Sequence, residues 1–440
     1  MTRITRRTGG TLAAMALAAG LAGPAVAQED TFKIGVITFL SGQAAESFGV
    51  PAWNGGKLLI DMLNEGGKLP APYDKKGFGG MTIEAVEVDE AGGATKQVQE
   101  FRNLVQREQV DAVVGYVSSS DCLAVPPVAD ELKAFTILYD CGTPRVFEEG
   151  SYKYVFRTAA HAAMDNVSLA RYLKARGTKI SSIAGLNQDY AWGQDSWADF
   201  KGSMAQLYPD AEVKTALFPK FGAGQYGTEI SALLREKPDL VHSSNWGGDL
   251  QAFLLQATAR KLHERAQVVL AAGDHVIPQL QNKMPDGIIL GARGVNGLAA
   301  KARGGELQEL TETIWNAYEA ENGTFPVQAP FRMWQALLGL KTAVEKAMAA
   351  NGGKKPNDEE LAAAMTGLEW DAPSGHIEMA LAGGHQAIQP NAIGVTKWNA
   401  DAGKMELVDV AYFASRCVNP PDGVKSQEWI AQGFPGAECK

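Results

Sequence analysis

Strand and helix patterns alternate through most of this 440-residue chain, and no other feature limits the possible fold as strongly. A strand pattern at residues 32–40 is followed by an amphipathic segment at 52–64, and the alternation continues to residue 140. It restarts at residue 162 and runs to residue 291. Strands separated by helix-length segments need right-handed crossovers and therefore form parallel sheets. The chain is predicted to be an α/β protein with two doubly wound parallel-sheet lobes.

The pattern changes after residue 291, where two helical segments at 307–321 and 328–350 precede several strand-like pieces. Two domains are expected at this length, because single cores stop growing near about 250 to 300 residues. We expect the late helices to return to the first lobe and the late strands to complete the second, which gives a three-strand hinge. The predicted crossings lie near residues 157–158, 291–294 and 373–375. The predicted units are a signal peptide (1–27), a first lobe (28–157 plus 295–373), a second lobe (158–294 plus 374–415) and a C-terminal tail (416–440).

The first 27 residues have the features of an export signal. Arginines precede an apolar stretch at 12–22, and Ala25-Val26-Ala27 is the small-x-small pattern that signal peptidase needs. The apolar stretch is too short for a bilayer of about 30 Å, and no later run reaches the roughly 20 apolar residues of a spanning helix. We expect cleavage near Ala27 and a soluble periplasmic protein without a membrane anchor. The pair Arg6-Arg7 leaves open whether export uses the Sec or the twin-arginine route.

The net charge and the motif content exclude several function classes. The net charge of −9 comes without a basic stripe, which argues against a nucleic-acid or anionic-membrane partner. The chain has no GxSxG elbow, no phosphate-binding GxxxxGK[ST] loop and no HExxH spacing. A GxGxxG match at 222–227 precedes a strand that ends without an acid for a ribose, so it is interpreted as a flexible loop. We predict no enzymatic activity, no cofactor and no metal.

Four cysteines are present, and none forms a CxxC pair, so zinc-ribbon and thioredoxin-like sites lack their basic spacing. An even number of cysteines in an exported protein indicates disulfides. We predict that Cys417 pairs with Cys439 across a Pro/Gly-rich tail, and that Cys122 pairs with Cys141, since both follow strands of the first lobe. Buried free thiols are the alternative.

Several short motifs occur in a fixed order along the chain. They are Ile34-Gly35-Val36, Ser41-Gly42, Asn64-Glu65-Gly66-Gly67, Val113-Val114-Gly115, Ser118-Ser119-Ser120, Gly142-Thr143-Pro144, Val155-Phe156-Arg157-Thr158 and Asp189-Tyr190-Ala191-Trp192-Gly193. As an ordered set they resemble the type I periplasmic solute-binding proteins, specifically the Leu/Ile/Val-type receptors of ABC importers. The resemblance covers most of the mature chain. It implies a non-catalytic receptor whose lobes close on a small organic solute and present it to a membrane permease, and we expect a monomer.

Solutes bind beyond the carboxyl ends of the strands in open α/β sheets, so residues at strand ends are the first candidates. Ser118, Ser119 and Ser120 follow a strand and precede a helix, where hydroxyls and backbone N–H groups suit a carboxylate. Helix capping accounts for one serine but not for three. By resemblance, Ser119 matches the ligand-binding serine of the family.

The next strand ends in a loop that contains Asp140, Cys141 and Gly142. Amino-acid receptors of the family usually offer small and hydroxyl residues here, so the resemblance implies that Asp140 changes the orientation of the ligand. Arg145, at the end of the same loop, has a guanidinium able to clamp an acid bidentately. Pairing of this arginine with Glu148 or Glu149 is the alternative.

By resemblance, Trp192 and Trp246 occupy positions where the family places aromatic residues against the ligand. Together with Phe48, and with Tyr190 or Trp53, they are expected to form a flat apolar box. Such a box favours planar or branched apolar solutes through buried area and stacking. Core packing is the alternative role, but a glycine follows each tryptophan at a strand end, which favours the pocket.

By resemblance, Asp274 lies close to the position of the acid that receives an ammonium group in amino-acid receptors. Gly273 is the competing match for that position. The alternative role for Asp274 is a helix cap or a salt bridge. Asp140 and Asp274 favour a hydrophobic or branched-chain amino acid as the solute, whereas Arg145 favours an aromatic carboxylate.

The sequence is also compatible with two other functions. One is a ligand-sensing subunit for a membrane signalling receptor, and the other is an exported amide or ester hydrolase.

Overall fold

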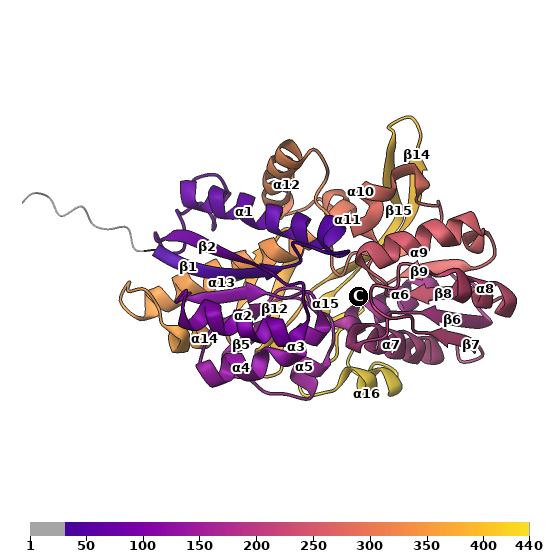
Figure 1. Ribbon diagram of the computed structural model, residues 1–440, viewed down its shortest axis with the longest axis horizontal. Helices are drawn as coiled ribbons and strands as arrows, with labels where there is room; N and C mark the ends of the chain where they lie inside the picture. Colours follow the sequence, from indigo (N-terminus) through magenta and orange to yellow (C-terminus); the bar gives the residue numbers. More distant parts are fainter. Residues whose placement is uncertain (1–30, 440) are drawn as a thin grey trace, which may run out of the picture.

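Two β-sheets organise residues 31–439, which are the residues that this computed structural model describes (Figure 1). In order across the first sheet, the strands are β11 (Glu369–Ala372), β12 (Gly375–Leu381), β13 (Gln386–Ile388), β5 (Val155–Arg157), β4 (Thr136–Leu138), β3 (Ala112–Gly115), β1 (Thr31–Thr38) and β2 (Thr82–Asp89). Those of the second sheet are β15 (Lys404–Phe413), β14 (Asn391–Asn399), β10 (Ile289–Gly291), β9 (Gln267–Leu270), β8 (Leu240–Ser243), β6 (Ser182–Leu186) and β7 (Glu212–Leu217). The signal peptide predicted at residues 1–27 lies outside the described residues.

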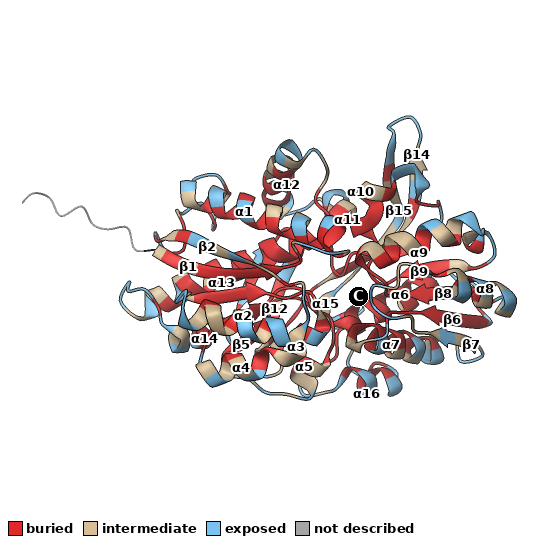
Figure 2. Cartoon of the chain, in the orientation of Figure 1, coloured by how far each residue is buried: buried red, intermediate tan, exposed pale blue. Residues whose placement is uncertain are grey.

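The central strands of both sheets are parallel and deeply buried, as Figure 2 shows in red. In β1, Ile34, Val36 and Ile37 are at most 1% exposed, so both faces of the strand are covered. A parallel sheet with two covered faces requires such nearly continuous apolar strands. The predicted α/β fold with two doubly wound lobes is confirmed, and each sheet also carries antiparallel strands at one edge.

Helices surround each sheet and complete the two lobes (Figure 1). Those of the first lobe are α1 (Val50–Glu65), α2 (Ala94–Gln106), α3 (Ser119–Ala124), α4 (Pro126–Leu132), α5 (Arg145–Glu148), α12 (Gln308–Asn322), α13 (Gln328–Ala350) and α14 (Asp358–Met365). Those of the second lobe are α6 (Ala162–Ala175), α7 (Ala191–Leu207), α8 (Gly227–Glu236), α9 (Gly247–Ala259) and α10 (Ile277–Leu280). Helix α11 (Gly297–Arg303) follows the second passage between the sheets and contacts α12 of the first lobe as well as β14 and β15 of the second. Within residues 31–439, none of the helices combines the length and the apolar character needed to cross a membrane.

The chain passes between the two sheets after β5, after β10 and after β13. The first two passages agree with the predicted positions, but the third prediction, near residues 373–375, is wrong. Ala372 pairs with Gly375 in a tight antiparallel hairpin, and β13 then pairs in parallel with β5 of the first sheet. Gly375, with φ +128°, therefore forms a turn of the first lobe. The third crossing lies between Ile388 and Asn391, which assigns β12 and β13 to the first lobe.

The C-terminal segment after β15 contains α15 (Ser415–Val418) and α16 (Ser426–Ala431) and contacts both lobes. Trp429 and Ile430 pack into an apolar cluster with residues of α6. The backbone N–H of Ser426 donates to Glu148 of the first lobe at 2.7 Å. Both predicted disulfides are present, Cys122–Cys141 and Cys417–Cys439, and the second one closes this segment into a loop.

Removal of the Cys417–Cys439 disulfide is expected to lower the free energy of unfolding by about 2–4 kcal/mol, because the bridge restricts the unfolded chain. The double variant Cys417→Ser/Cys439→Ser tests this by denaturant unfolding under oxidising conditions. The parent protein under reducing conditions provides a second measurement. Unchanged stability of the double variant would contradict a structural role of this bridge.

Candidate ligand-binding cleft

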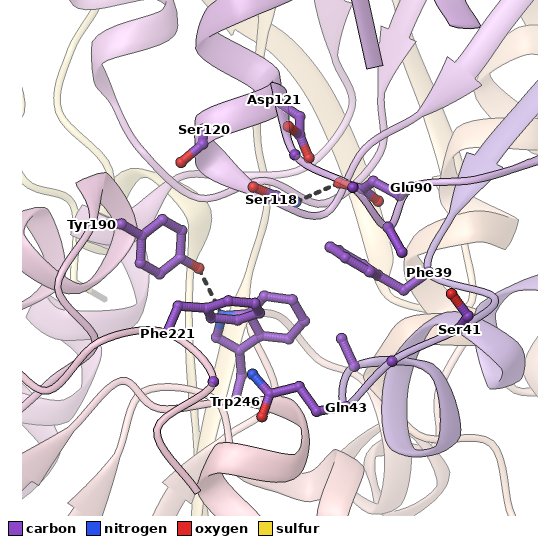
Figure 3. Close-up of a pocket in the computed structure, with 16 residues that line it drawn as sticks. Phe39, Ser41, Gln43, Glu90, Ser118, Ser120, Asp121, Tyr190, Phe221 and Trp246 are labelled. Carbon is purple, nitrogen blue, oxygen red and sulfur yellow. Dashed lines mark hydrogen bonds between the residues drawn. The ribbon is translucent and has the colours of Figure 1, made fainter. Parts of the chain in front are cut away.

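A cavity of about 410 Å³ lies between the two lobes (Figure 3). Its walls come from segments that follow strand ends in both sheets, which is where open α/β sheets place their ligands. The first lobe contributes Phe39, Ser41, Gly42, Gln43, Ala44, Glu90, Ala91, Gly92, Gly93, Ser118, Ser120 and Asp121, and the second lobe contributes Tyr190, Phe221, Gly222 and Trp246. We call this space the outer cavity.

Trp246 is the centre of an aromatic wall built from both lobes. Its ring centroid lies 5.8 Å from that of Phe39 and 5.5 Å from that of Phe48 in the first lobe, and 5.3 Å from that of Phe221 in the second. The indole N–H donates to the Tyr190 hydroxyl at 2.7 Å, which fixes the orientation of the ring. Because the wall combines both lobes, it is complete only when they are closed.

Two carboxyl groups lie on the side of the cavity opposite Trp246 (Figure 3). Glu90, at the end of β2, is fully buried and accepts hydrogen bonds from the backbone N–H groups of Val117 at 2.9 Å and Ser118 at 2.7 Å. Burial and then the neighbouring Asp121 raise the pKa of Glu90 well above its ordinary value. Burial also raises the pKa of Asp121 to about 6. We call Glu90 and Asp121 the acid pair.

A second, inner cavity of about 20 Å³ lies deeper between the lobes, next to Trp192 and Trp246. Space of this size holds about one water molecule. The side chain of Arg293 fills the surrounding region, with its guanidinium 4.6 Å from the centre of the Trp192 ring. Arg293 pairs with Asp140 at 2.8 Å and with Asp165 at 3.1 Å. Burial raises the pKa of Asp165 to about 6, although the arginine opposes that shift.

Polar contacts join the two lobes beside the cavities. Asp195 of α7 accepts hydrogen bonds from Arg145 at 2.6 Å and from the Thr143 hydroxyl at 2.6 Å. At the mouth of the outer cavity, the backbone N–H of Gly248 donates to the carbonyl oxygen of Gln43 at 2.9 Å. The lobes are therefore in direct contact, and the arrangement is that of a closed clamp.

The comparison with known families identifies this clamp. The family model described as "Periplasmic binding protein" matches residues 31–404, which include both lobes and the cleft. The chain belongs to this family. A curated relative of this periplasmic binding protein, Leu/Ile/Val-binding protein homolog 4 of Brucella abortus (strain 2308), is 23% identical over 255 residues. That match spans 56% of this chain and 58% of the length of the relative.

Solved structures share the fold over nearly their whole length. A solute binding protein of an ABC transporter from Rhodopseudomonas palustris BisB5, in complex with 3,4-dihydroxy benzoic acid, has a TM-score of 0.74 at 22% identity, and the match covers 88% of this chain and 98% of that one. A leucine binding protein from Thermotoga maritima MSB8 has a TM-score of 0.69 at 19% identity, with 86% and 98% covered.

Seven of the ten predicted ligand-binding residues of this periplasmic binding protein lie at the two cavities. Ser118 and Ser120 line the outer cavity, and Trp246 lines both. The inner cavity is lined by Phe48, Asp140, Gly142 and Trp192. Gly142 lies so close to Trp192 that an added Cβ would be 2.2 Å from the ring, so only glycine fits there.

The other three predicted residues line neither cavity, because each has a partner within the protein. Ser119 accepts a hydrogen bond from the backbone N–H of Thr143 at 3.2 Å. Arg145 pairs with Asp195, and neither with a glutamate nor across a cavity. Asp274 accepts a hydrogen bond from the first N–H of α13, that of Gln328, at 2.7 Å, which makes it the helix cap considered as the alternative.

Several cavity residues were missed from the sequence. Phe39 and Glu90 directly follow β1 and β2, so the rule of strand ends applies to them as it does to Ser118. Phe221 directly precedes the segment 222–227 that was interpreted as a flexible loop, and its side chain is 39% exposed at the outer cavity. Arg293 follows β10 in a crossing segment, where the sequence patterns signal a change of lobe and give no sign of a buried ion pair.

Residues 31–439 of this periplasmic binding protein contain no group of three or more His, Cys, Asp or Glu side chains that is able to hold a metal ion. The buried histidines nearest the cleft are also unsuited to acid–base chemistry at neutral pH. Burial lowers the pKa of both His242 and His275 to about 3. The cleft thus offers rings, hydroxyls and carboxyl groups for recognition.

The cap formed by Asp274 has a pH dependence that is testable. Burial raises the pKa of this carboxyl from 3.8 to about 7. The folded protein therefore keeps a proton that the unfolded chain loses, and folding becomes less favourable as the pH rises from about 4 to about 7. Asparagine accepts the same hydrogen bond without titrating. Relative to the parent, Asp274→Asn is expected to gain stability with rising pH over this window.

Denaturant unfolding of both proteins at pH 5, 6, 7 and 8 measures the difference in stability. It should grow up to about pH 7 and then level off. The exposed residue Asp401 provides a matched control, Asp401→Asn. A stability difference for Asp274→Asn that stays constant between pH 5 and pH 7 would contradict the burial of an ionisable carboxyl at this cap.

Proposed function

We propose that this protein is the extracytoplasmic receptor of an ABC importer, and that it binds one small organic solute between its lobes and delivers it to a membrane permease. The observation that carries the proposal is the outer cavity, whose aromatic and polar walls come from both lobes. A solute placed there contacts both lobes at once. It therefore binds the closed form better than the open form, which is the condition for a ligand to drive closure.

The similar proteins support this function. One of them binds 3,4-dihydroxy benzoic acid as part of an ABC transporter, and another is a leucine binding protein. Both share the two-lobe fold, and family membership of this chain extends over residues 31–404. We propose export to the periplasm through the N-terminal signal, and monomeric action there.

The mechanism follows from the three passages between the lobes. Rotation about these passages separates Trp246 from Phe39 and Phe48, which opens the aromatic wall to solvent. When the solute enters and the lobes close, apolar surface is buried at about 25 cal/mol per Å². The contacts of Asp195 with Arg145 and Thr143 then form beside the site. No bond of the solute changes in this cycle, and the walls of the outer cavity contain no His, Cys or Lys side chain.

A ligand screen combined with solution scattering tests the proposed function. A panel of amino acids, aromatic acids, aromatic amines, amides and polyols is added to the mature protein, and the midpoint of thermal unfolding is recorded. A compound present at 100 times its Kd should stabilise the protein by about 2.7 kcal/mol. The same compound should reduce the radius of gyration and be recovered unchanged. A chemically converted compound, or saturation without compaction, would refute the proposed function.

A further inference from the structure

The charge of the outer cavity differs from that expected of a site for organic acids. Its lining residues include two carboxyl groups, Glu90 and Asp121, and no Lys, Arg or His. The backbone N–H groups of Val117 and Ser118, which an anionic ligand would need, already donate to Glu90. Figure 3 shows the acid pair and Ser118 together on one side of the cavity, opposite Trp246.

The inner cavity does not offer an alternative anion site in this closed form. Its only basic lining residue is Arg293, whose guanidinium is shared between Asp140 and Asp165. The remaining space of about 20 Å³ is too small for an organic solute. A solute held between the closed lobes therefore lies in the outer cavity, next to the acid pair.

One carboxylate oxygen of the acid pair has no partner. Among residues 31–439, nothing forms a hydrogen bond with Oδ1 of Asp121, although the residue is only 2% exposed. A buried carboxylate oxygen without a donor is costly unless a ligand supplies one. An ammonium group has N–H donors and no acceptors, so it is the natural complement to the Asp121 carboxyl group at the cavity wall.

The aromatic wall favours the same kind of ligand. Tyr190, Phe221 and Trp246 line the cavity opposite the acid pair, and Phe39 lies beside Glu90 (Figure 3). The faces of aromatic rings attract organic cations, and the attraction is strongest for indole. The same rings bury the apolar body of a solute.

We propose that the outer cavity binds a small organic cation, with its ammonium group at Asp121 and Glu90 and its apolar body against Trp246, Phe39 and Phe221. This inference rests on the proposed function and specifies the class of solute. The site selects amines over organic acids because it contains uncompensated carboxyl groups and no basic side chain.

The proposed site has a pH dependence that follows from its surroundings. The groups facing the acid pair are Tyr116 and Tyr139 at the ends of β3 and β4, and Tyr190 across the cavity. Burial raises the pKa of each of these phenols, so they stay neutral near pH 7; Glu100 also acts on Tyr116. Near neutral pH, the acid pair is therefore the group that titrates. A bound cation favours its ionised form and releases a proton.

Calorimetry with 2-phenylethylamine tests the inference on the unmodified mature protein. The neutral analogue 2-phenylethanol and the anion 3-phenylpropionate are measured in parallel. The amine is expected to bind at least 10-fold more tightly than either analogue, and more tightly at pH 8 than at pH 5. Its apparent heat should depend on the ionisation heat of the buffer in the sense of proton release. Magnesium chloride and potassium chloride, as inorganic cations alone, should give no comparable heat.

Asp121→Asn is the matching variant, and it is expected to weaken the amine at least 10-fold and to reduce the proton release. Glu84→Gln, at an exposed position of β2 away from the cavity, should leave both unchanged. The inference is overturned if benzoate, 3-phenylpropionate or leucine binds and compacts the protein while the amine does not. It is also overturned if the amine binds without proton release. If no compound in the full screen binds, the proposed receptor function fails together with the inference about amines. Binding of another compound without binding of the amine overturns only the inference, so the two failures are distinguishable.

Discussion

Replacement of Arg293 by alanine is expected to lower the free energy of unfolding by about 3–5 kcal/mol, because it leaves the buried Asp165 without its partner and Asp140 with only the more distant Arg332. Arg293 is 5% exposed and forms ion pairs with Asp140 and Asp165, which are both fully buried. Its guanidinium also lies against Trp192. The loss should be smaller at pH 5 than at pH 8, since protonation of Asp165, the carboxyl left without a partner, removes its buried charge.

Two further variants separate charge from packing. Arg293→Met keeps most of the side-chain volume, and should still be strongly destabilised. Adding only Asp165→Asn to it should recover part of the loss, because Asp140 still faces Arg332 at 3.8 Å and no carboxylate is then left without a cation. The exposed pair Arg102–Glu131 provides the control: Arg102→Ala is expected to cost less than about 1 kcal/mol. An equal loss for Arg293→Ala and Arg102→Ala in denaturant unfolding would refute the structural role of Arg293.

The backbone at Arg293 explains why the sequence did not reveal this residue. Its φ of +52° lies in the left-handed region, which costs about 1–3 kcal/mol for a residue other than glycine and is often found at functional sites. The neighbouring Gly294, with φ +138°, made the segment resemble a simple hinge. Local sequence patterns indicate where the backbone is able to change direction. The ion pair between Arg293 and Asp140 depends instead on how the closed lobes meet, which no local pattern shows.

The elements that were predicted correctly depend on local periodicity. The apolar run of β1 and the amphipathic pattern of α1 are set within a few residues, and the fold follows from their alternation. The third crossing failed because proline and glycine at 373–375 signal a change of direction without specifying whether it is a hinge or a hairpin. Likewise, residues at strand ends were recognisable, but the partner that each one finds was not. Arg145 and Asp274 have partners in other elements that no sequence spacing predicts.

Trp246→Ala is expected to weaken the best ligand of the screen at least 30-fold, which corresponds to about 2 kcal/mol. Trp246 lines both cavities and is the ring that contacts Phe39 and Phe48 across the cleft. Removing it deletes the largest apolar surface available to a solute and the aromatic contact that completes closure. The scattering experiment should accordingly show less compaction at saturating ligand. A folded Trp246→Ala protein that binds as tightly as the parent would remove the outer cavity as the binding site.

Two other tryptophan variants make the result specific to the cleft. Trp398→Ala removes a half-buried indole from β14, which lies outside both cavities, so it should leave the affinity unchanged even if stability falls. Trp246→Phe keeps an aromatic face but loses the hydrogen bond to Tyr190, worth about 0.5–1.5 kcal/mol. Its affinity should therefore lie between that of the parent and that of Trp246→Ala. This order is expected because the ring supplies the buried area for the solute, whereas the hydrogen bond to Tyr190 only orients the ring toward the acid pair.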